Sequence, residues 1–500
     1  MNEARFVLDE RFDIAELDRR VFGSFVEHMG RAVYDGIFEE GGEYSDAQGY
    51  RQDVLALVRE IGTTMVRYPG GNFVSAYNWE DGVGPVADRP RRLDLAWRSV
   101  ESNRVGIDEF SRWCDLAGVE MMMACNLGTR GVDAARNLVE YCNHPGGSYW
   151  SDRRRANGRE TPYGVKVWCL GNEMDGPWQI GHKTAQEYGR IALESAKAMR
   201  RVDPTIELVA CGSSNREMPT FGGWEATVLG ECYDQVDYLS LHSYYEDADG
   251  DAKSFLASSD SMDDFIETVA SICDYARARC HSRTTMKLSF DEWNVWHRTE
   301  FHSGDDTREP WLTAPHLAED QYTTLEAVVV GSLMTSLLNH ADRVKMACLA
   351  QLVNVIAPIS TAAGHPAWRQ PTFFPFAQVA GAARGRVLRG VLTSPTFACE
   401  KYGEVPAIAA SAVFDDETGD LVVFAANKSL EAHVPFSVEF GGDLRGYALR
   451  EHRVLGGDDV TAQNTVDHPD RVAPVDAGVS DGIVLAPVSW HMMRWSPAAR

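Results

Sequence analysis

Two glutamates, Glu173 and Glu292, each follow an apolar run that is typical of a buried β-strand. The first run is Val165–Leu170 and the second is Met286–Phe290. Enzymes built as (β/α)₈ barrels carry their catalytic groups at the carboxyl ends of the barrel strands. Two carboxylates in such positions can act as acid/base and nucleophile at a glycosidic carbon. The pair therefore predicts glycoside hydrolysis, provided that the rest of the chain forms a barrel.

Eight short apolar runs are expected to form the strands of such a barrel. Longer segments with apolar residues at helical spacing separate them, and Asp53–Ile61 and Thr184–Val202 are two examples. Strands that alternate with helices in this way predict a (β/α)₈ barrel. The expected strands are Val21–Val26, Thr64–Tyr68, Met121–Cys125, Val165–Leu170, Ile206–Ala210, Tyr238–Leu241, Met286–Phe290 and Val344–Leu349.

The residues that follow these strands are rich in Glu, Asn, Gln, His and aromatic side chains. Turns are polar in most proteins, and this explains part of the set. Amides that hydrogen-bond to hydroxyls and flat rings that cover C–H surfaces are also what a sugar requires, so the pattern indicates a sugar pocket. The set comprises Glu27-His28, Gly70-Gly71-Asn72, Asn126, Asn172-Glu173, Ser213-Ser214-Asn215, His242-Ser243-Tyr244-Tyr245, Glu292-Trp293-Asn294, Gln351 and Asn354.

A second module is expected after the barrel, because 500 residues exceed what one barrel usually needs. Beyond about residue 385 the pattern changes to short alternating segments, and Ala407–Phe414 and Leu421–Ala426 read as a β-hairpin. We predict a barrel over 18–384 and a jelly-roll-like antiparallel β-sandwich over 385–500. The N-terminal stretch 1–17 is expected to join the sandwich through a strand at Ala4–Leu8.

Composition excludes several classes of partner. The net charge of −25 argues against nucleic acid, whose phosphates such a surface repels. The N-terminus lacks the apolar core of a signal peptide, and no apolar run reaches the length of a membrane span. The ten cysteines form no Cys-x-x-Cys motif, and several lie in expected core strands, where free thiols behave as small hydrophobes. A cytoplasmic protein with reduced cysteines and no membrane contact is therefore expected.

Six segments carry a resemblance to a known family: Phe22–Arg31, Arg67–Phe73, Tyr77–Gly82, Trp168–Glu173, Asp291–Trp296 and Gln351–Pro358. In these segments the chain resembles the retaining α-L-arabinofuranosidases of glycoside hydrolase family 51. The matches cover nearly the whole barrel in the same order. Arg67–Phe73 and Gln351–Asn354 are the more specific pieces, whereas Gly171-Asn172-Glu173 is shared by a wider clan of barrel glycosidases.

The resemblance implies a reaction and a set of roles. Glu173 is the expected general acid/base and Glu292 the expected nucleophile, with no cofactor and no metal. The implied substrates are oligosaccharides derived from arabinoxylan or arabinan, from which terminal α-L-arabinofuranosyl residues are released. The family often assembles into hexamers, and the loop Phe301–Pro315 is expected to shape the space beyond the arabinose. The implied substrate-binding residues are Glu27, Asn72, Trp97, Asn172, Tyr244 and Gln351.

Other interpretations stay open at this point. Asn72 could serve only the turn after two glycines, and Trp97 could belong to the core. A metal-dependent enzyme is disfavoured because His28, His242 and His297 show no ligand spacing. A non-catalytic sugar-binding protein does not account for the two glutamates. The same mechanism on a β-xyloside or β-glucan is compatible with the fold, because the pocket walls decide the choice of sugar.

Overall fold

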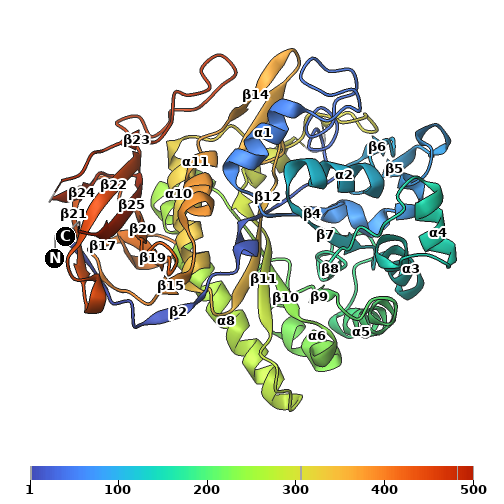
Figure 1. Ribbon diagram of the computed structural model, residues 1–500, viewed down its shortest axis with the longest axis horizontal. Coiled ribbons are helices and arrows are strands. Elements are labelled where there is room, and N and C mark those ends of the chain that lie inside the picture. Colours follow the sequence, from blue (N-terminus) through green and yellow to red (C-terminus); the bar gives the residue numbers. More distant parts are fainter. Residues whose placement is uncertain (1–2, 305–306, 481, 499–500) are drawn as a thin grey trace.

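Eight parallel strands close into a barrel at the centre of the molecule (Figure 1). The computed structural model describes residues 3–304, 307–480 and 482–498. The barrel strands are β3 (Gly23–Phe25), β4 (Met65–Tyr68), β7 (Glu120–Cys125), β8 (Val167–Leu170), β9 (Glu207–Ala210), β10 (Tyr238–Tyr245), β11 (Lys287–Val295) and β12 (Val344–Ala350). They pair in chain order, and β12 closes the ring on β3. The predicted (β/α)₈ barrel is confirmed.

Strand boundaries differ from the expected ones at two places that matter for the site. β10 and β11 extend past Leu241 and Phe290, so Glu292 lies within a strand instead of beyond its end. The polar residues here stay in the ladder, where His242 pairs in register with Glu292. Irregularities follow Ser240 in β10 and Phe290 in β11, and bulges of this kind redirect side chains next to active sites.

Helices cover the outside of the barrel (Figure 1). The expected helical segments form α1 and α5, and α5 begins with a capping box in which the Thr184 N–H donates to the Glu187 carboxylate over 2.9 Å. No helix in the described ranges is long and apolar enough to cross a membrane. The helices are α1 (Gln52–Ile61), α2 (Ile107–Ala117), α3 (Val132–Asn143), α4 (Tyr149–Ala156), α5 (Ala185–Val202), α6 (Gly223–Cys232), α7 (Ala252–Leu256), α8 (Ser258–Arg279), α9 (Arg298–Ser303), α10 (Thr324–Asn339) and α11 (Phe373–Ala382).

Side chains fill the barrel, so it is a packed core and not a pore. The interior cluster contains Phe25, Met65, Met122, Val167, Tyr238 and Met346. Small residues such as Ala124 and Cys348 alternate with these larger ones around the ring. Polar chemistry is therefore confined to one end of the barrel.

Two β-sheets form the module beside the barrel (Figure 1). The smaller sheet has the order β16 (Val391–Thr393), β1 (Ala4–Leu8), β21 (Val434–Phe440) and β24 (Ile483–Leu485). The larger has the order β2 (Asp13–Glu16), β15 (Arg386–Leu388), β19 (Ile408–Phe414), β20 (Leu421–Asn427), β25 (Ser489–Pro497), β22 (Tyr447–Leu455) and β23 (Val475–Asp476). One buried apolar cluster joins their facing surfaces. β1 runs parallel to β21, so the smaller sheet is not wholly antiparallel as predicted, because this strand comes from the other end of the chain.

The outer face of the larger sheet packs directly on the barrel helices α10 and α11. The approach is closest at Gly331 of α10, where an added Cβ would overlap the Trp490 ring of β25. The buried Lys428 ammonium, at the end of β20, forms an ion pair with Asp260 of α8. The barrel and the sheets therefore share one continuous packed interior. Three separate hairpins complete the fold: β5–β6 (Arg92–Asp94, Ser99–Glu101), β13–β14 (Ile359–Ala362, His365–Arg369) and β17–β18 (Thr396–Cys399, Gly403–Pro406).

A buried histidine pair in the larger sheet should make stability depend on pH. His491 Nδ1 lies 2.9 Å from His452 Nε2, and burial, with His452 nearby, lowers the pKa of His491 to about 3. In the unfolded chain the His491 ring takes up a proton near pH ~6.5, whereas in the folded chain it stays neutral at that pH. The free energy of unfolding therefore falls as pH drops below that value. We expect His491→Gln to remove up to about 1.4 kcal/mol per pH unit of this slope.

The measurement is urea unfolding at several pH values between about 6.5 and 5. His365→Gln, at an exposed histidine of β14, is the matched control and should keep the wild-type slope. Equal slopes for His491→Gln and the wild type would contradict the assignment.

Candidate active site

A cavity of ≈ 1210 Å³ opens at the carboxyl end of the barrel strands. Its lining comes from residues that follow or end successive strands, which is where barrel enzymes place their chemistry. Lining residues from this strand-end set are Asn72, Glu173, Ser214, Asn215, Ser243, Tyr244, Tyr245 and Trp296. Trp97 and Trp178 add aromatic walls.

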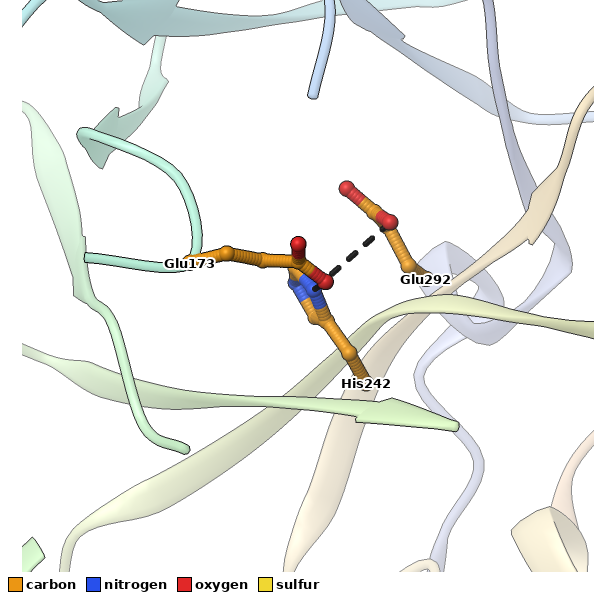
Figure 2. A group of neighbouring side chains, drawn as sticks. All are labelled: Glu173, His242 and Glu292. Carbon is orange, nitrogen blue, oxygen red and sulfur yellow. Dashed lines mark hydrogen bonds and ion pairs between the residues drawn. The ribbon is translucent and has the colours of Figure 1, made fainter. Parts of the chain in front are cut away.

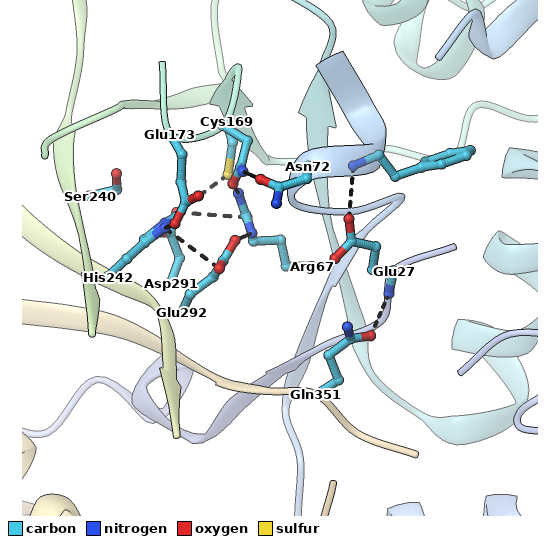
Figure 3. A network of polar contacts seen from close by, with 12 residues as sticks. Glu27, Arg67, Asn72, Cys169, Glu173, Ser240, His242, Asp291, Glu292 and Gln351 are labelled. Carbon is cyan, nitrogen blue, oxygen red and sulfur yellow. Dashed lines mark hydrogen bonds and ion pairs between the residues drawn. The ribbon is translucent and has the colours of Figure 1, made fainter. Parts of the chain in front are cut away.

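The Glu292 carboxylate is fixed by donors from two other barrel strands, β4 and β10. Arg67 Nη1 donates to Oε1 over 2.7 Å (Figure 3), and the Tyr244 hydroxyl donates to Oε2 over 2.8 Å. Arg67 is 1% exposed; burial opposes its charge, but Asp291, Cys169 and Glu292 together hold its pKa well above the usual range. An oriented carboxylate beside a permanent cation favours the ionised form that a nucleophile requires.

Glu173 occupies an unusual backbone conformation just beyond β8. Its φ of 44° lies in the left-handed region, which residues other than glycine seldom adopt. Its Oε1 lies 3.0 Å from His242 Nδ1, and its Oε2 accepts from Trp178 Nε1 over 2.7 Å. Strained backbone of this kind is concentrated at functional sites. The turn aims this carboxyl into the cavity, toward Glu292 (Figure 2).

His242 lies between three carboxylates (Figures 2 and 3). Its Nε2 is 3.0 Å from Asp291 Oδ1, and its Nδ1 is 3.0 Å from Glu173 Oε1 and 3.6 Å from Glu292 Oε2. Burial alone would lower the pKa of His242, but Glu292, Asp291 and Glu173 raise it to about 10. The ring is therefore cationic at neutral pH and reduces the repulsion among these acids.

The side chains of Glu173, His242 and Glu292 are close enough to serve as metal ligands, since one ligand atom of each lies within 4.8 Å of the others. A cation here would have to share Glu292 with the Arg67 guanidinium, 2.7 Å away. It would also lie beside a His242 ring that the surrounding acids keep protonated and that offers no lone pair. The donor set therefore fits a carboxylate pair better than a metal centre.

Glu27, Trp97 and Gln351 form an adjoining group. Glu27 Oε1 accepts from the Phe73 N–H over 2.8 Å and from Trp97 Nε1 over 3.0 Å. Gln351 Oε1 accepts from the Glu27 N–H over 3.0 Å (Figure 3). Burial raises the pKa of Glu27 to about 8, with the charge of Glu292 adding to it and the hydrogen bonds opposing it. At neutral pH this carboxyl holds a proton that it can donate to a hydroxyl.

The two asparagines lie on the other side of Arg67. Asn172 Oδ1 accepts from Arg67 Nη2 over 2.7 Å, and Asn172 Nδ2 lies 3.5 Å from Asn72 Oδ1. Gly71 lies between Glu27 and Glu292, because an added Cβ would lie 3.1 Å from Glu27 Oε2 and 3.2 Å from Glu292 Oε1. Of the eight residues predicted from the sequence, Asn72, Trp97, Glu173 and Tyr244 line the cavity. The other four are linked to this lining by the hydrogen bonds given above: Glu27, Asn172, Glu292 and Gln351.

Three further residues of the site were missed, and His242 was expected at a strand end without a role. Arg67 and Asp291 had a signal, because a charged residue inside an apolar strand is seldom fully buried without partners. Trp178 had none, since it follows Glu173 in a loop of ordinary composition. The expected loop Phe301–Pro315 does contribute to the cavity, although its residues 305–306 lie outside the described ones. Phe301 of that loop packs on Trp296 with ring centroids 5.3 Å apart.

Comparisons with known proteins agree with this architecture. Two family models match, the α-L-arabinofuranosidase 1 domain over residues 57–265 and the α-L-arabinofuranosidase C-terminal domain over 291–489. A solved family 51 α-L-arabinofuranosidase from Bifidobacterium longum superposes with a TM-score of 0.96 at 45% identity, covering 99% of both chains. The intracellular exo-α-(1→5)-L-arabinofuranosidase 1 of Bacillus subtilis (strain 168) is 52% identical over 500 residues, 99% of each chain.

This chain belongs to the α-L-arabinofuranosidases of glycoside hydrolase family 51. The resemblance and the glycosidase class predicted from the sequence are confirmed, and a non-catalytic sugar-binding protein is excluded. A further relative, the exo-α-(1→6)-L-arabinofuranosidase of Bifidobacterium longum, is 50% identical, and the match covers 98% of this chain and 97% of that protein.

Proposed function

We propose that this family 51 enzyme releases terminal, non-reducing α-L-arabinofuranosyl residues by double displacement with retention of configuration. The observation that carries the proposal is the approach of Glu173 and Glu292, whose nearest ligand oxygens lie within 4.8 Å. Retaining glycosidases hold their carboxyl groups ~5–5.5 Å apart, whereas inverting ones leave ~6.5–9.5 Å for a water molecule. The short separation supports retention.

In the proposed first step, Glu292 attacks the anomeric carbon and Glu173 protonates the departing oxygen. Arg67 and Tyr244 hold the Glu292 carboxylate in place through hydrogen bonds to its two oxygens. In the second step, Glu173 removes a proton from water, which releases arabinose from Glu292. His242 contacts Glu173 and lies 3.6 Å from Glu292, so its positive charge can offset the negative charge that moves between the two.

The sugar would be held by the two groups at the base of the cavity. Asn72 and Asn172 offer amides, and Glu27 offers a carboxyl that is protonated at neutral pH. Gln351 orients Glu27 through its backbone, and Trp97 supplies a wall. Because these groups form a base beneath the catalytic pair, a terminal arabinosyl unit fits the cavity better than an internal one.

The linkage preference, the site of action in the cell, the domain bounds and the assembly are also proposals. Two relatives of nearly equal identity are named for (1→5) and (1→6) linkages, so linkage preference depends on local features of the cavity wall. The intracellular name of the Bacillus subtilis relative supports action inside the cell on short oligosaccharides derived from arabinan or arabinoxylan. The division into a barrel at 18–384 and a β-sandwich at 385–500, and a hexameric assembly, remain proposals on the family resemblance.

The test is a panel of 4-nitrophenyl glycosides assayed side by side with a chelator present. We expect kcat/KM on the α-L-arabinofuranoside to exceed that on the β-D-xyloside or β-D-glucoside by about 10²-fold or more, because the pocket groups match one arrangement of hydroxyls. Proton NMR of the first product should show the α-anomer. A better xyloside or glucoside would refute the sugar assignment, and a β-anomer formed first would refute double displacement.

A further inference from the structure

The β17–β18 hairpin reaches the cavity from outside the barrel. It lies in the chain between β16 and β19, yet it forms a separate two-stranded sheet apart from both larger ones. Its turn residues, Lys401 and Tyr402, line the same cavity as Glu173 and Tyr244. Residues that follow the barrel in sequence thus contribute to the wall of the active-site cavity.

The barrel holds this turn in place. The Lys401 backbone N–H donates to the Ser254 hydroxyl of α7 over 3.0 Å, and Ser254 is buried. Beside it, Ala257, Cys399 and Val405 form a buried apolar cluster, on which the Tyr402 ring packs in part. A hydrogen bond and apolar contacts hold this turn, so its side chains keep a defined position. A ligand that binds such a preformed site loses little entropy in ordering it.

The hairpin lies beyond the catalytic pair, across the rim of β10. Adjacent residues of a strand point to opposite sides, and the Tyr244 hydroxyl points to Glu292 in the barrel mouth. Tyr245 points the other way and still lines the cavity. Tyr402 of the hairpin turn lines the same cavity as Tyr245. The cavity therefore extends outward from the catalytic pair to the hairpin.

The size and lining of this outer part suit a carbohydrate chain. Sites for drug-sized ligands occupy ~300–1,000 Å³, so ≈ 1210 Å³ accommodates more than one sugar ring. The Lys401 ammonium lies 5.3 Å from the centre of the Tyr402 ring. The same cavity is lined by Asn215 and Glu217 from the segment after β9. Cation, hydroxyl, amide and carboxylate together offer donors and acceptors for a polyhydroxylated, uncharged unit.

We propose that Lys401 and Tyr402 form a distal subsite, which binds a sugar unit beyond the one that bears the terminal arabinose. The inference rests on the proposed exo-arabinofuranosidase function and adds a chain-length preference to it. A disaccharide or an aryl glycoside is too short to reach the hairpin. A longer chain gains hydrogen bonds there.

The experiment compares kcat/KM on 4-nitrophenyl α-L-arabinofuranoside, α-(1→5)-arabinobiose and α-(1→5)-arabinotetraose. The wild type should prefer the tetraose to the biose. The double variant Lys401→Ala/Tyr402→Ala should lose about 5-fold or more on the tetraose through a higher KM, with both short substrates unchanged. Tyr402→Phe keeps the packing and should lose part of this effect. Glu404→Ala, on exposed β18 and outside the cavity lining, is the matched control.

The way in which activity depends on the length of the substrate distinguishes the possible results. Equal losses on all three substrates, or no loss on the tetraose, would overturn the distal subsite, and so would a wild type that prefers the biose. Inactivity of the wild type on the aryl arabinofuranoside would overturn the proposed function, and the subsite with it. Full activity there without a chain-length effect would overturn the subsite alone.

Discussion

Replacing Glu292 with glutamine is expected to lower kcat on 4-nitrophenyl α-L-arabinofuranoside by about 10⁴-fold or more, a loss of the order seen when a catalytic nucleophile is removed. Glutamine keeps the shape of the side chain; its one amide oxygen can accept from Arg67, and its NH₂ group can donate to the Tyr244 hydroxyl oxygen. It cannot form the ester with the anomeric carbon on which double displacement depends. The loss should therefore appear in kcat, and thermal unfolding should remain cooperative.

The control for this variant is a second buried glutamate that pairs with an arginine away from the cavity. Glu140 of α3 is 9% exposed and accepts from Arg136 over 3.3 Å. Glu140→Gln should keep activity within about 2-fold, because a surface-proximal ion pair contributes little. Retention of a tenth or more of wild-type kcat by Glu292→Gln would contradict the nucleophile assignment.

Replacing Glu173 with alanine is expected to give a loss that depends on the leaving group. With an unactivated arabinoside the loss should be about 10²–10⁴-fold, the usual contribution of general acid catalysis. With a 2,4-dinitrophenyl arabinoside the first step needs little protonation, so a burst of phenol should precede slow turnover. Azide needs no general base, and it should restore turnover and yield the arabinosyl azide.

Glu217→Ala is the matched control, because it removes a cavity-lining carboxylate that, among the described residues, makes no hydrogen bond or ion pair with Glu173 or Glu292. This variant should hydrolyse the unactivated and the 2,4-dinitrophenyl arabinoside at the wild-type rate. Equal losses of Glu173→Ala on good and poor leaving groups, without an azide product, would exclude it as the acid/base.

The barrel was predictable because its strands are short apolar runs between amphipathic helices. The runs ending at Leu170 and Ala210 stop where the strands stop. The ends of β10 and β11 were not predictable, since Tyr245 and Val295 are reached through polar residues that stay hydrogen-bonded in the ladder. Local polarity signals the end of a strand only where a turn follows it.

The two catalytic glutamates of the site could be predicted from the sequence, whereas the residues that surround them could be predicted only in part. Glu173 and Glu292 stand out by their position after apolar runs, and motif resemblance assigned the substrate-binding set. The charge balance at His242 depends on acids from β11 and from the end of β8, and adjacency across a barrel is not encoded locally. The same holds for Tyr402, which reaches the cavity from a hairpin more than two hundred residues beyond Glu173.

The pairing of β1 with β21 has a consequence for biosynthesis. Ala4–Leu8 is translated before the barrel, and its parallel neighbour Val434–Phe440 follows more than four hundred residues later. The barrel can close on the nascent chain while this first strand still lacks a sheet. Its inward side chains, Ala4, Phe6 and Leu8, are all buried in the finished protein. Throughout elongation they remain an exposed apolar segment of the kind that chaperones shield, until the last strands arrive to cover it.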